Sequence, residues 1–127
     1  MKKFNTTYKL IKKHGFANLK NFGFEHPKVC GGCSVLINKK LRVVAKKRSD
    51  ITLFNDIRMF DKKDLIPMVF IRHANKKIKY IIQCLADTTP KKRCRAKRIL
   101  NRKYPGSNDL HTYNVGYYRN KPVIFDW

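Results

Sequence analysis

The chain has 127 residues, 43% of them hydrophobic, and it carries 30 Lys and Arg against 8 Asp and Glu, a formal net charge of +22. This length and apolar content favour a single folded domain spanning residues 1–127 over a disordered basic tail, and the helices and hairpins expected along the chain predict the α+β class with an antiparallel sheet. The longest apolar run, Leu65 to Ile71, is far shorter than the about 20 residues that cross a bilayer. No apolar signal segment follows Met1. We therefore expect a cytoplasmic protein without a membrane partner.

The positive charge is distributed unevenly along the sequence. Residues 1–49 carry 13 Lys and Arg against Glu25 alone, residues 50–89 carry 7 against 5 Asp, and residues 90–127 carry 10 against 2 acids. Such cationic density repels itself in a compact chain unless a polyanion is bound. Nucleic acid is the partner that this charge favours.

The first predicted element is a short basic helix over residues 4–13. Its apolar members are Tyr8, Leu10 and Ile11, and it stops at His14-Gly15. An isolated helix of this length is marginal in water, so it needs packing against the rest of the chain.

Three β-hairpins are expected, because Asn-Lys pairs stand between apolar, strand-like runs and Asn tolerates the positive φ of tight turns. The hairpins cover 34–45, 67–86 and 111–127, with turns at Asn38-Lys39, Asn75-Lys76 and Asn120-Lys121. In the middle hairpin this turn pairs Val69 with Ile82, Phe70 with Ile81, Ile71 with Tyr80, Arg72 with Lys79 and His73 with Ile78. Like charges directly opposite each other favour a surface that faces phosphate, although an Asp would neutralise them equally well.

The last hairpin is rich in aromatic residues. Its turn pairs Gly116 with Phe125, Tyr117 with Ile124 and Tyr118 with Val123. Tyr113, Tyr118 and Arg119 are the expected surface residues, and Tyr beside Arg is an arrangement that stacks unpaired bases. The alternative is that the aromatic rings are buried as part of the hydrophobic core.

A second, more strongly signalled helix is predicted over residues 90–103. Thr89 is its N-cap, Pro90 its first residue and Tyr104-Pro105-Gly106 its stop. The inward stripe is Ala96, Ile99, Leu100 and Tyr104. Cations in the first turn are disfavoured by the helix dipole by roughly 0.3 to 1 kcal/mol each, so Lys91, Lys92 and Arg93 predict an anion site, unless they only reflect a chain that is basic throughout.

Cys30-Gly-Gly-Cys33 is the most motif-like local feature. Its two thiolates could form half of a zinc site, with the other ligands drawn from His26, His73, Cys84 or Cys94. A redox pair and buried thiols in a glycine turn are the alternatives. Cys84 and Cys94 fit core positions better than ligand positions. Apart from zinc, no cofactor is indicated.

Catalysis would have to use the few acids and histidines of the chain. The candidates are Asp50, Asp56, Asp61, Asp64, His14, His26, His73 and His111. Asp61 and Asp64 suit one helix face, yet lysines interleave with them and could simply pair with them. The periodicity of residues 51–64 fits neither a helix nor a strand.

The sequence therefore indicates a non-catalytic nucleic-acid-binding protein, such as a ribonucleoprotein component or a phage- or plasmid-type factor, with RNA or single strands favoured over duplex DNA. The alternatives are a small nuclease or toxin-like ribonuclease, and an inhibitor that binds an acidic protein surface. The expected contact residues are Lys39, Lys40, Arg42, Lys46, Lys47, Arg48, Arg72, Lys79, Lys91, Lys92, Arg93, Arg95, Lys97, Arg98, Arg102, Lys103, Tyr113, Tyr118 and Arg119.

Overall fold

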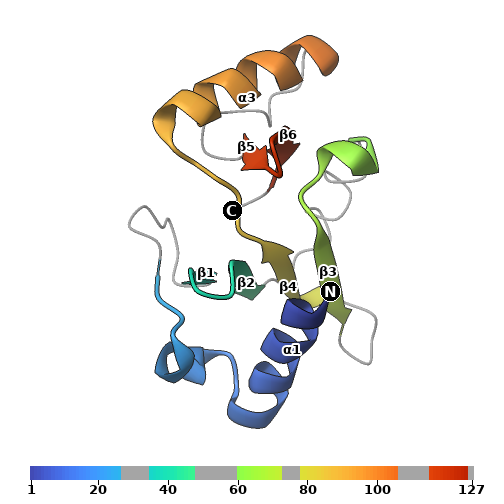
Figure 1. The fold of residues 1–127 in the computed structure, drawn as a ribbon. Helices are drawn as coiled ribbons and strands as arrows, with labels where there is room; N and C mark the ends of the chain where they lie inside the picture. The colour runs from blue at the N-terminus through green and yellow to red at the C-terminus, as the bar shows by residue number, and fades with distance from the viewer. Residues whose placement is uncertain (27–34, 48–59, 73–77, 106–114, 126–127) are drawn as a thin grey trace. The chain divides into compact units, whose positions relative to one another are not determined.

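The computed structural model describes residues 1–26, 35–47, 60–72, 78–105 and 115–125. Contacts divide the chain into two compact units: unit 1 is Met1–Phe54 with Pro67–Leu85, and unit 2 is Asn55–Ile66 with Ala86–Trp127. The α+β class is confirmed, but the three hairpins form two separate sheets (Figure 1). Within the described ranges, no helix is long and apolar enough to cross a membrane.

Unit 1 begins with helix α1, Lys2–His14, which confirms the first predicted helix. The hydroxyls of Thr6 and Thr7 donate to the carbonyls one turn back, at 3.1 and 2.9 Å. The helix ends at Gly15, whose φ of 85° and ψ of 156° favour glycine. Its buried face is Phe4, Thr7 and Ile11. Of the apolar residues named for this helix, Ile11 is buried, whereas Tyr8 is 36% exposed.

A short 3₁₀ helix leads from α1 to the sheet. The 3₁₀ helix η1, Ala17–Phe22, buries Leu19 completely and ends at Gly23 in the left-handed conformation. Glu25 then exchanges two backbone hydrogen bonds with Ile37, at 2.9 and 2.8 Å. These bonds place the chain beside the outer edge of strand β1.

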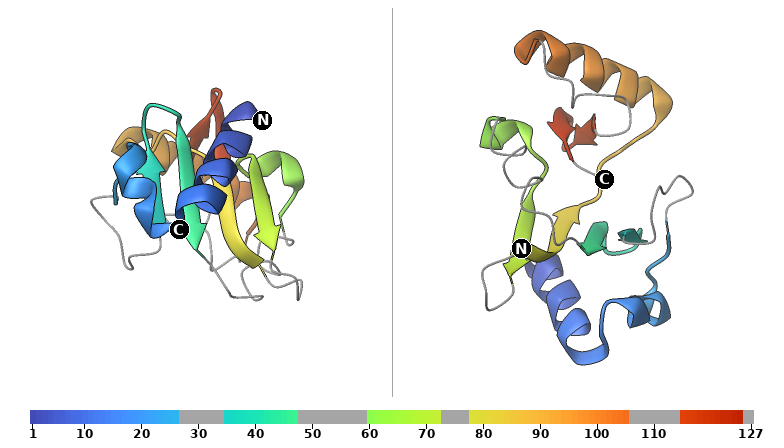
Figure 2. Two further views of the ribbon diagram at one scale, coloured as in Figure 1. Left: turned by 90° about the horizontal axis from the view of Figure 1, so that it is seen from below. Right: turned by 180° about the vertical axis from the view of Figure 1, so that it is seen from behind.

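The sheet of unit 1 is antiparallel and has the order β1-β2-β4-β3. Its strands are β1 (Val35–Asn38), β2 (Val43–Lys47), β3 (Met68–Arg72) and β4 (Ile78–Cys84). Helix α1 packs against β2 and β4, as two views show (Figures 1 and 2), and the Cys84 thiol lies 3.6 Å from the Met1 sulfur. Strand β3 therefore forms a sheet edge that α1 does not cover fully, and Val69 on it is 38% exposed.

The first hairpin has its turn two residues later than predicted. Asn38 pairs with Val43 as a strand residue, which leaves residues 39–42 as the loop. The side-chain oxygen Oδ1 of Asn38 accepts a hydrogen bond from the Leu41 amide at 2.9 Å. Asn38 therefore stabilises the loop through its side chain and does not adopt positive φ. Arg42 takes the left-handed conformation instead, with φ of 58°.

The middle hairpin follows the predicted register over most of its length. Val69 pairs with Ile82, Phe70 with Ile81 and Ile71 with Tyr80. The register then shifts between Ile71 and Arg72, so that Arg72 pairs with Ile78. The predicted pairing of Arg72 with Lys79 is wrong because of this bulge. The turn itself and the pairing of His73 lie outside the described residues.

Unit 2 is built on the third hairpin, β5 (Val115–Tyr118) and β6 (Lys121–Ile124). Tyr118 pairs with Lys121 and Gly116 with Val123, so the predicted partners are wrong by two residues. The turn is Arg119-Asn120, one residue earlier than predicted, and both residues have positive φ, 50° and 62°. This is the backbone of a two-residue type I′ turn.

The core of unit 2 lies between this hairpin and helix α3, Pro90–Lys103. Ala96, Leu100, Val115 and Ile124 are its buried members, with Phe60, Leu65, Tyr104 and Tyr117 packed around them. The amide of Ile66 donates to Ile124 at 3.0 Å, and Asp87 exchanges backbone bonds with Tyr117 at 2.7 and 3.0 Å. The chain therefore runs along both edges of the small hairpin and holds it in place.

Candidate nucleic-acid interface

Helix α3 has the bounds that its sequence predicts, 90 to 103. Thr89 precedes it in an extended conformation, and Pro90 occupies the first turn. Thr89 makes no side-chain cap. Instead, Oδ1 of Asp87 accepts the Thr89 amide at 3.1 Å, and Oδ2 of Asp87 lies 2.7 Å from the Lys92 ammonium. A carboxylate of the chain itself thus lies at the cationic helix start where an external anion was predicted.

The outward face of α3 is a stripe of cations, which we call the α3 stripe: Lys91, Arg95, Arg98 and Arg102. All four side chains are exposed. At 3.6 residues per turn they fall within about 60° of one another around the helix axis. They lie opposite Ala96 and Leu100, which are buried in the core of unit 2. Ile99 was expected to point inward, yet it is 42% exposed on the flank of the stripe.

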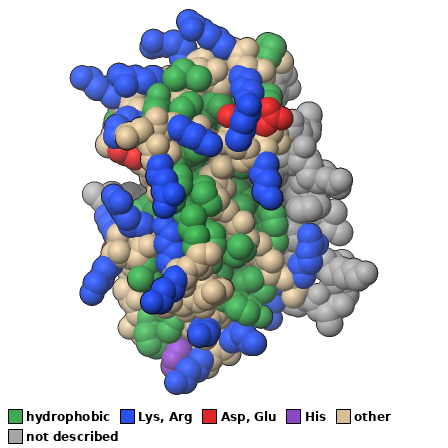
Figure 3. All heavy atoms as spheres, turned by 45° about the vertical axis from the view of Figure 1, so that its right-hand side comes forward, with side chains coloured by type: hydrophobic (Ala, Val, Ile, Leu, Met, Phe, Trp, Pro, Cys, Tyr) green, Lys and Arg blue, Asp and Glu red, His purple; other side chains and the backbone are tan. Residues whose placement is uncertain are grey.

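The carboxylates described near α3 pair with its flank and not with the α3 stripe. Asp87 pairs with Lys92, while Asp61 and Asp64 lie 3.3 and 2.6 Å from the Lys103 ammonium. Lys92 and Lys103 share one flank of the helix, about 100° from the centre of the stripe. Among the described residues no ion pair involves a member of the α3 stripe. On the face drawn in Figure 3, Lys and Arg side chains far outweigh the small acidic patches.

The pair of Asp61 and Asp64 is engaged with α3. The Tyr104 hydroxyl donates to Oδ2 of Asp64 at 2.5 Å and accepts the Asp61 amide at 3.0 Å. Burial raises the pKa of Asp64, but hydrogen bonds from Lys103 and Tyr104 outweigh it and leave the pKa below its ordinary value. Burial and the hydrogen bond to Asp64 raise the pKa of Tyr104. The two carboxylates pair with a lysine, as the sequence allowed, but that lysine is Lys103 and not a neighbour in the loop.

In unit 1 the predicted basic strand divides into exposed and buried residues. Lys39, Lys40, Arg42 and Lys47 are exposed. Lys39 lies 3.5 Å from Glu25, and both side chains are largely in solvent. Lys46 is 1% exposed, so the prediction that it contacts nucleic acid from the surface is wrong. Arg48 lies outside the described residues.

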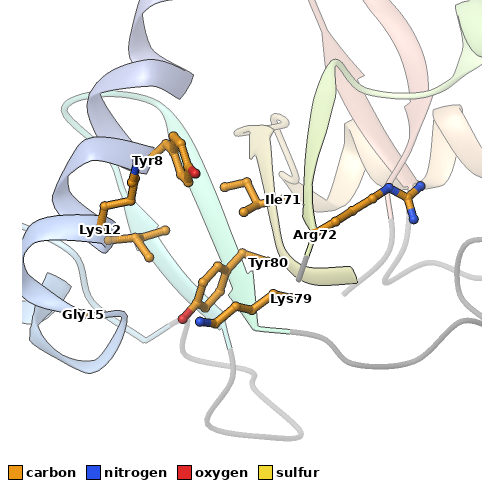
Figure 4. Close-up of a pocket in the computed structure, with 8 residues that line it drawn as sticks. Tyr8, Lys12, Gly15, Ile71, Arg72, Lys79 and Tyr80 are labelled. Atoms are coloured by element: carbon orange, nitrogen blue, oxygen red, sulfur yellow. The ribbon is translucent and has the colours of Figure 1, made fainter. Parts of the chain in front are cut away.

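A pocket of about 450 Å³ opens in unit 1 between the end of α1 and the ends of β3 and β4 (Figure 4). We call it the tyrosine pocket. Its lining is Tyr8, Ile11, Lys12, Gly15, Ile71, Arg72, Lys79 and Tyr80, and these described residues include no acid. The Lys12 ammonium lies 5.2 Å from the centre of the Tyr8 ring, and the Lys79 ammonium lies 5.2 Å from that of Tyr80. Phe16 stacks on Tyr80 at 5.6 Å with nearly parallel rings.

Arg72 and Lys79 were predicted to face one anion as a directly opposed pair. Both line the tyrosine pocket, but the Arg72 side chain points away from Tyr8 and Tyr80 in Figure 4. Lys12, Tyr8 and Tyr80 are pocket residues that sequence reasoning missed. Tyr8 and Lys12 are four residues apart on one helix, and this spacing is the sequence signal that could have identified the part of the pocket that α1 contributes.

The remaining predicted contact residues of unit 2 are less prominent. Arg93 and Lys97 are half-buried on α3. Arg119 is exposed at the tip of the third hairpin, 5.4 Å from the ring of Tyr118, which is half-buried. Tyr113 lies outside the described residues.

The predicted zinc ligands Cys30 and Cys33 also lie outside the described residues, so that hypothesis stays a prediction. Cys84 is buried, as expected for a core cysteine, whereas Cys94 is exposed on α3, contrary to expectation. His26 makes a backbone contact: its Nδ1 lies 3.0 Å from the Val35 carbonyl oxygen. In the part of the chain that the structure describes, no group of three or more His, Cys, Asp or Glu could hold a metal ion.

Compared with known proteins, the chain matches no family model, no curated protein sequence and no solved structure.

Proposed function

We propose that this protein is a non-catalytic nucleic-acid-binding protein of the cytoplasm, and that the α3 stripe contacts the phosphate backbone. The observation that carries the proposal is the separation of charges on α3. Its carboxylate partners neutralise the flank at Lys92 and Lys103, while Lys91, Arg95, Arg98 and Arg102 remain together on the outer face. In the first turn of α3, where the helix dipole favours acids, stability alone would disfavour Lys91, and no acid stands there.

The length of the stripe suits a polyanion. Lys91 and Arg102 are eleven residues apart, which at 1.5 Å per residue is about 16 Å along the helix. One strand of a duplex advances about 3.4 Å per nucleotide, so the stripe matches about five nucleotides of a backbone. Contacts to phosphate position a protein on nucleic acid without reading its sequence. We therefore expect weak sequence dependence and strong salt dependence.

The test is a binding titration of labelled RNA, single-stranded DNA and duplex DNA, each at low and moderate salt. The variant Arg95→Ala/Arg98→Ala/Arg102→Ala removes three cations from an exposed helix face, where alanine supports helix formation. It should weaken binding at low salt and lower the salt slope by about 0.7 to 0.9 for each phosphate that is no longer neutralised. The matched control, Lys2→Ala/Lys9→Ala/Lys13→Ala, removes the same charge from exposed positions of α1.

Two results would contradict the proposal. Binding that is equally strong at both salt concentrations would exclude a phosphate interface. An equally large drop in affinity in the α1 control would show that the total charge, and not the α3 stripe, determines affinity. Incubating the same labelled strands with Mg²⁺ or with EDTA tests the non-catalytic part, because cleavage would favour a nuclease. A pull-down after nuclease treatment tests for an acidic protein partner instead.

A further inference from the structure

The tyrosine pocket combines the two kinds of group that bind a nucleotide. Aromatic rings stack nucleobases, and lysine ammonium groups bind the phosphates next to them. We propose that this pocket holds an unpaired nucleobase of a single strand, stacked on Tyr8, with the adjoining phosphate on Lys12 or Lys79. This inference rests on the proposed function and adds to it a preference for single strands.

The aromatic part of the pocket is held in place by its surroundings. Phe16 stacks on one face of Tyr80 with an interplanar angle of 11°, so the Tyr80 ring is fixed as a platform. Tyr8 projects from α1, where it is 36% exposed although it is a large aromatic residue. Tyr8 and Tyr80 come from different elements, a helix and a strand, and both line the same pocket (Figure 4). A base that enters the pocket can therefore stack on the partly exposed Tyr8 ring, while the fixed Tyr80 ring lines the same pocket.

The charged part of the pocket favours an anion. Lys12 and Lys79 both reach the pocket, and its described lining contains no Asp or Glu. Each ammonium lies over a tyrosine ring, 5.2 Å from the ring centre, so a base that stacks on Tyr8 displaces the flexible Lys12 side chain toward the adjoining phosphate. An acidic peptide would satisfy the two lysines but would leave the faces of the tyrosine rings unused. The observations thus favour a nucleotide over a peptide.

The size of the pocket agrees with a single nucleotide unit. Its volume of about 450 Å³ lies within the range of small-molecule sites, about 300 to 1,000 Å³. A base within a duplex is stacked on its neighbours, and taking it out of the stack is costly. An unpaired base enters without that cost, so the pocket should distinguish single strands from duplexes.

The test compares a labelled single-stranded RNA with a duplex of the same length, using wild type, Tyr8→Ala and Tyr8→Phe. Tyr8 is partly exposed, so its replacement should leave the fold intact, which circular dichroism checks. Removing the stacking of one base should weaken single-strand binding roughly 5- to 150-fold. Duplex binding should be unchanged, and Tyr8→Phe, which keeps the ring, should bind like wild type. Photo-crosslinking of 5-iodouridine-substituted RNA should label Tyr8.

The outcomes separate this inference from the function on which it rests. If Arg95→Ala/Arg98→Ala/Arg102→Ala weakens binding but Tyr8→Ala leaves single-strand affinity at the wild-type level, the pocket inference is overturned and the proposed function stands. An equal decrease on single strand and duplex in Tyr8→Ala also overturns it. If the wild-type protein binds neither form, both proposals fail together. Binding of a polyglutamate peptide that Tyr8→Ala leaves unchanged, without crosslinking of RNA to the pocket, would overturn the nucleotide site in favour of a peptide site.

Discussion

The ammonium of Lys103 lies 2.6 Å from Oδ2 of Asp64, and this pair joins the last turn of α3 to the 3₁₀ turn η2, Lys62–Asp64. The side chain of Asp64 is only 14% exposed, so the contact is partly shielded from solvent. The Tyr104 hydroxyl shares the same carboxylate oxygen. One carboxylate therefore anchors the end of the proposed phosphate-binding helix.

Replacing this carboxylate should destabilise the protein. Asp64→Asn removes the charge that accepts hydrogen bonds from Lys103 and Tyr104, and hydrogen bonds to charged groups contribute about 1.5 to 3 kcal/mol each at most. We expect a decrease of about 1 to 3 kcal/mol in the free energy of unfolding at pH 7, measured by urea denaturation. The exposed carboxylate Asp61 provides the control, because Asp61→Asn should cost far less.

The same variant defines a pH dependence. The pKa of Asp64 is lower in the folded protein than its ordinary value of 3.8, so the folded state favours the ionised carboxylate. Its contribution to stability is therefore present above about pH 4 and is lost as the pH falls through the folded pKa. The stability difference between wild type and Asp64→Asn should shrink below about pH 4. A difference that stays constant from neutral to strongly acidic pH would contradict this assignment.

Gly116 should not tolerate a side chain. A Cβ atom there would lie 2.7 Å from the Asp87 carbonyl oxygen and 3.3 Å from the Phe125 ring. The Asp87 oxygen is part of the backbone and already accepts the Tyr117 amide at 3.0 Å, so it has no room to shift. We expect Gly116→Ala to lower the free energy of unfolding by about 1 to 3 kcal/mol. Thermal unfolding followed by circular dichroism measures this, and a wild-type melting temperature would show that the two backbones are farther apart.

The turn of the third hairpin should respond in the opposite direction. Arg119 and Asn120 both have positive φ, and Asn-Gly is the preferred sequence for a type I′ turn. Arg119→Asn/Asn120→Gly should therefore raise the free energy of unfolding by about 0.5 to 1 kcal/mol. The control variant Arg119→Gly/Asn120→Val places a β-branched residue at positive φ and should destabilise the hairpin. If the Asn-Gly variant unfolds more easily than wild type, the turn assignment is wrong.

At the start of α3, Asp87 has two separable contributions. Asp87→Asn keeps an acceptor for the Thr89 amide but removes the ion pair with Lys92. Because both side chains are substantially exposed, the decrease in stability should stay below about 1 kcal/mol. Lys92 then becomes available to an external phosphate, so affinity for nucleic acid at low salt should rise. An unchanged affinity would show that Lys92 lies outside the interface.

Local sequence signals predicted the helices better than the turns. Gly15 and Pro90 set the end of α1 and the start of α3, because their effects act within one turn of the chain. The Asn residues were recognised as turn residues, but Asn38 acts through its side chain and Asn120 takes the second turn position instead of the first. Composition does not distinguish these uses of Asn, so two of the three turns were misplaced.

Features that depend on tertiary contacts could not be derived from the sequence. The helical period places Ile99 next to Leu100, but only the packing of the small hairpin shows that Leu100 is buried and Ile99 is not. Lys103 and Asp64 are far apart in the chain, and nothing in either neighbourhood indicates the other. The tyrosine pocket likewise needs α1 and two strands to meet. Its helical pair, Tyr8 and Lys12, is visible in the sequence, whereas its partner Tyr80 is not.

The exposed Arg72 at the end of β3 affects how copies of this protein behave in solution. Strand β3 is a sheet edge with a partly exposed Val69, and such edges recruit strands from other molecules. The residue left unpaired by the register shift is Lys79 in the inner strand β4, so β3 itself runs on without interruption to the exposed Arg72. The charge of Arg72 at the end of this edge disfavours the addition of a second copy and thus guards the sheet against edge-to-edge aggregation.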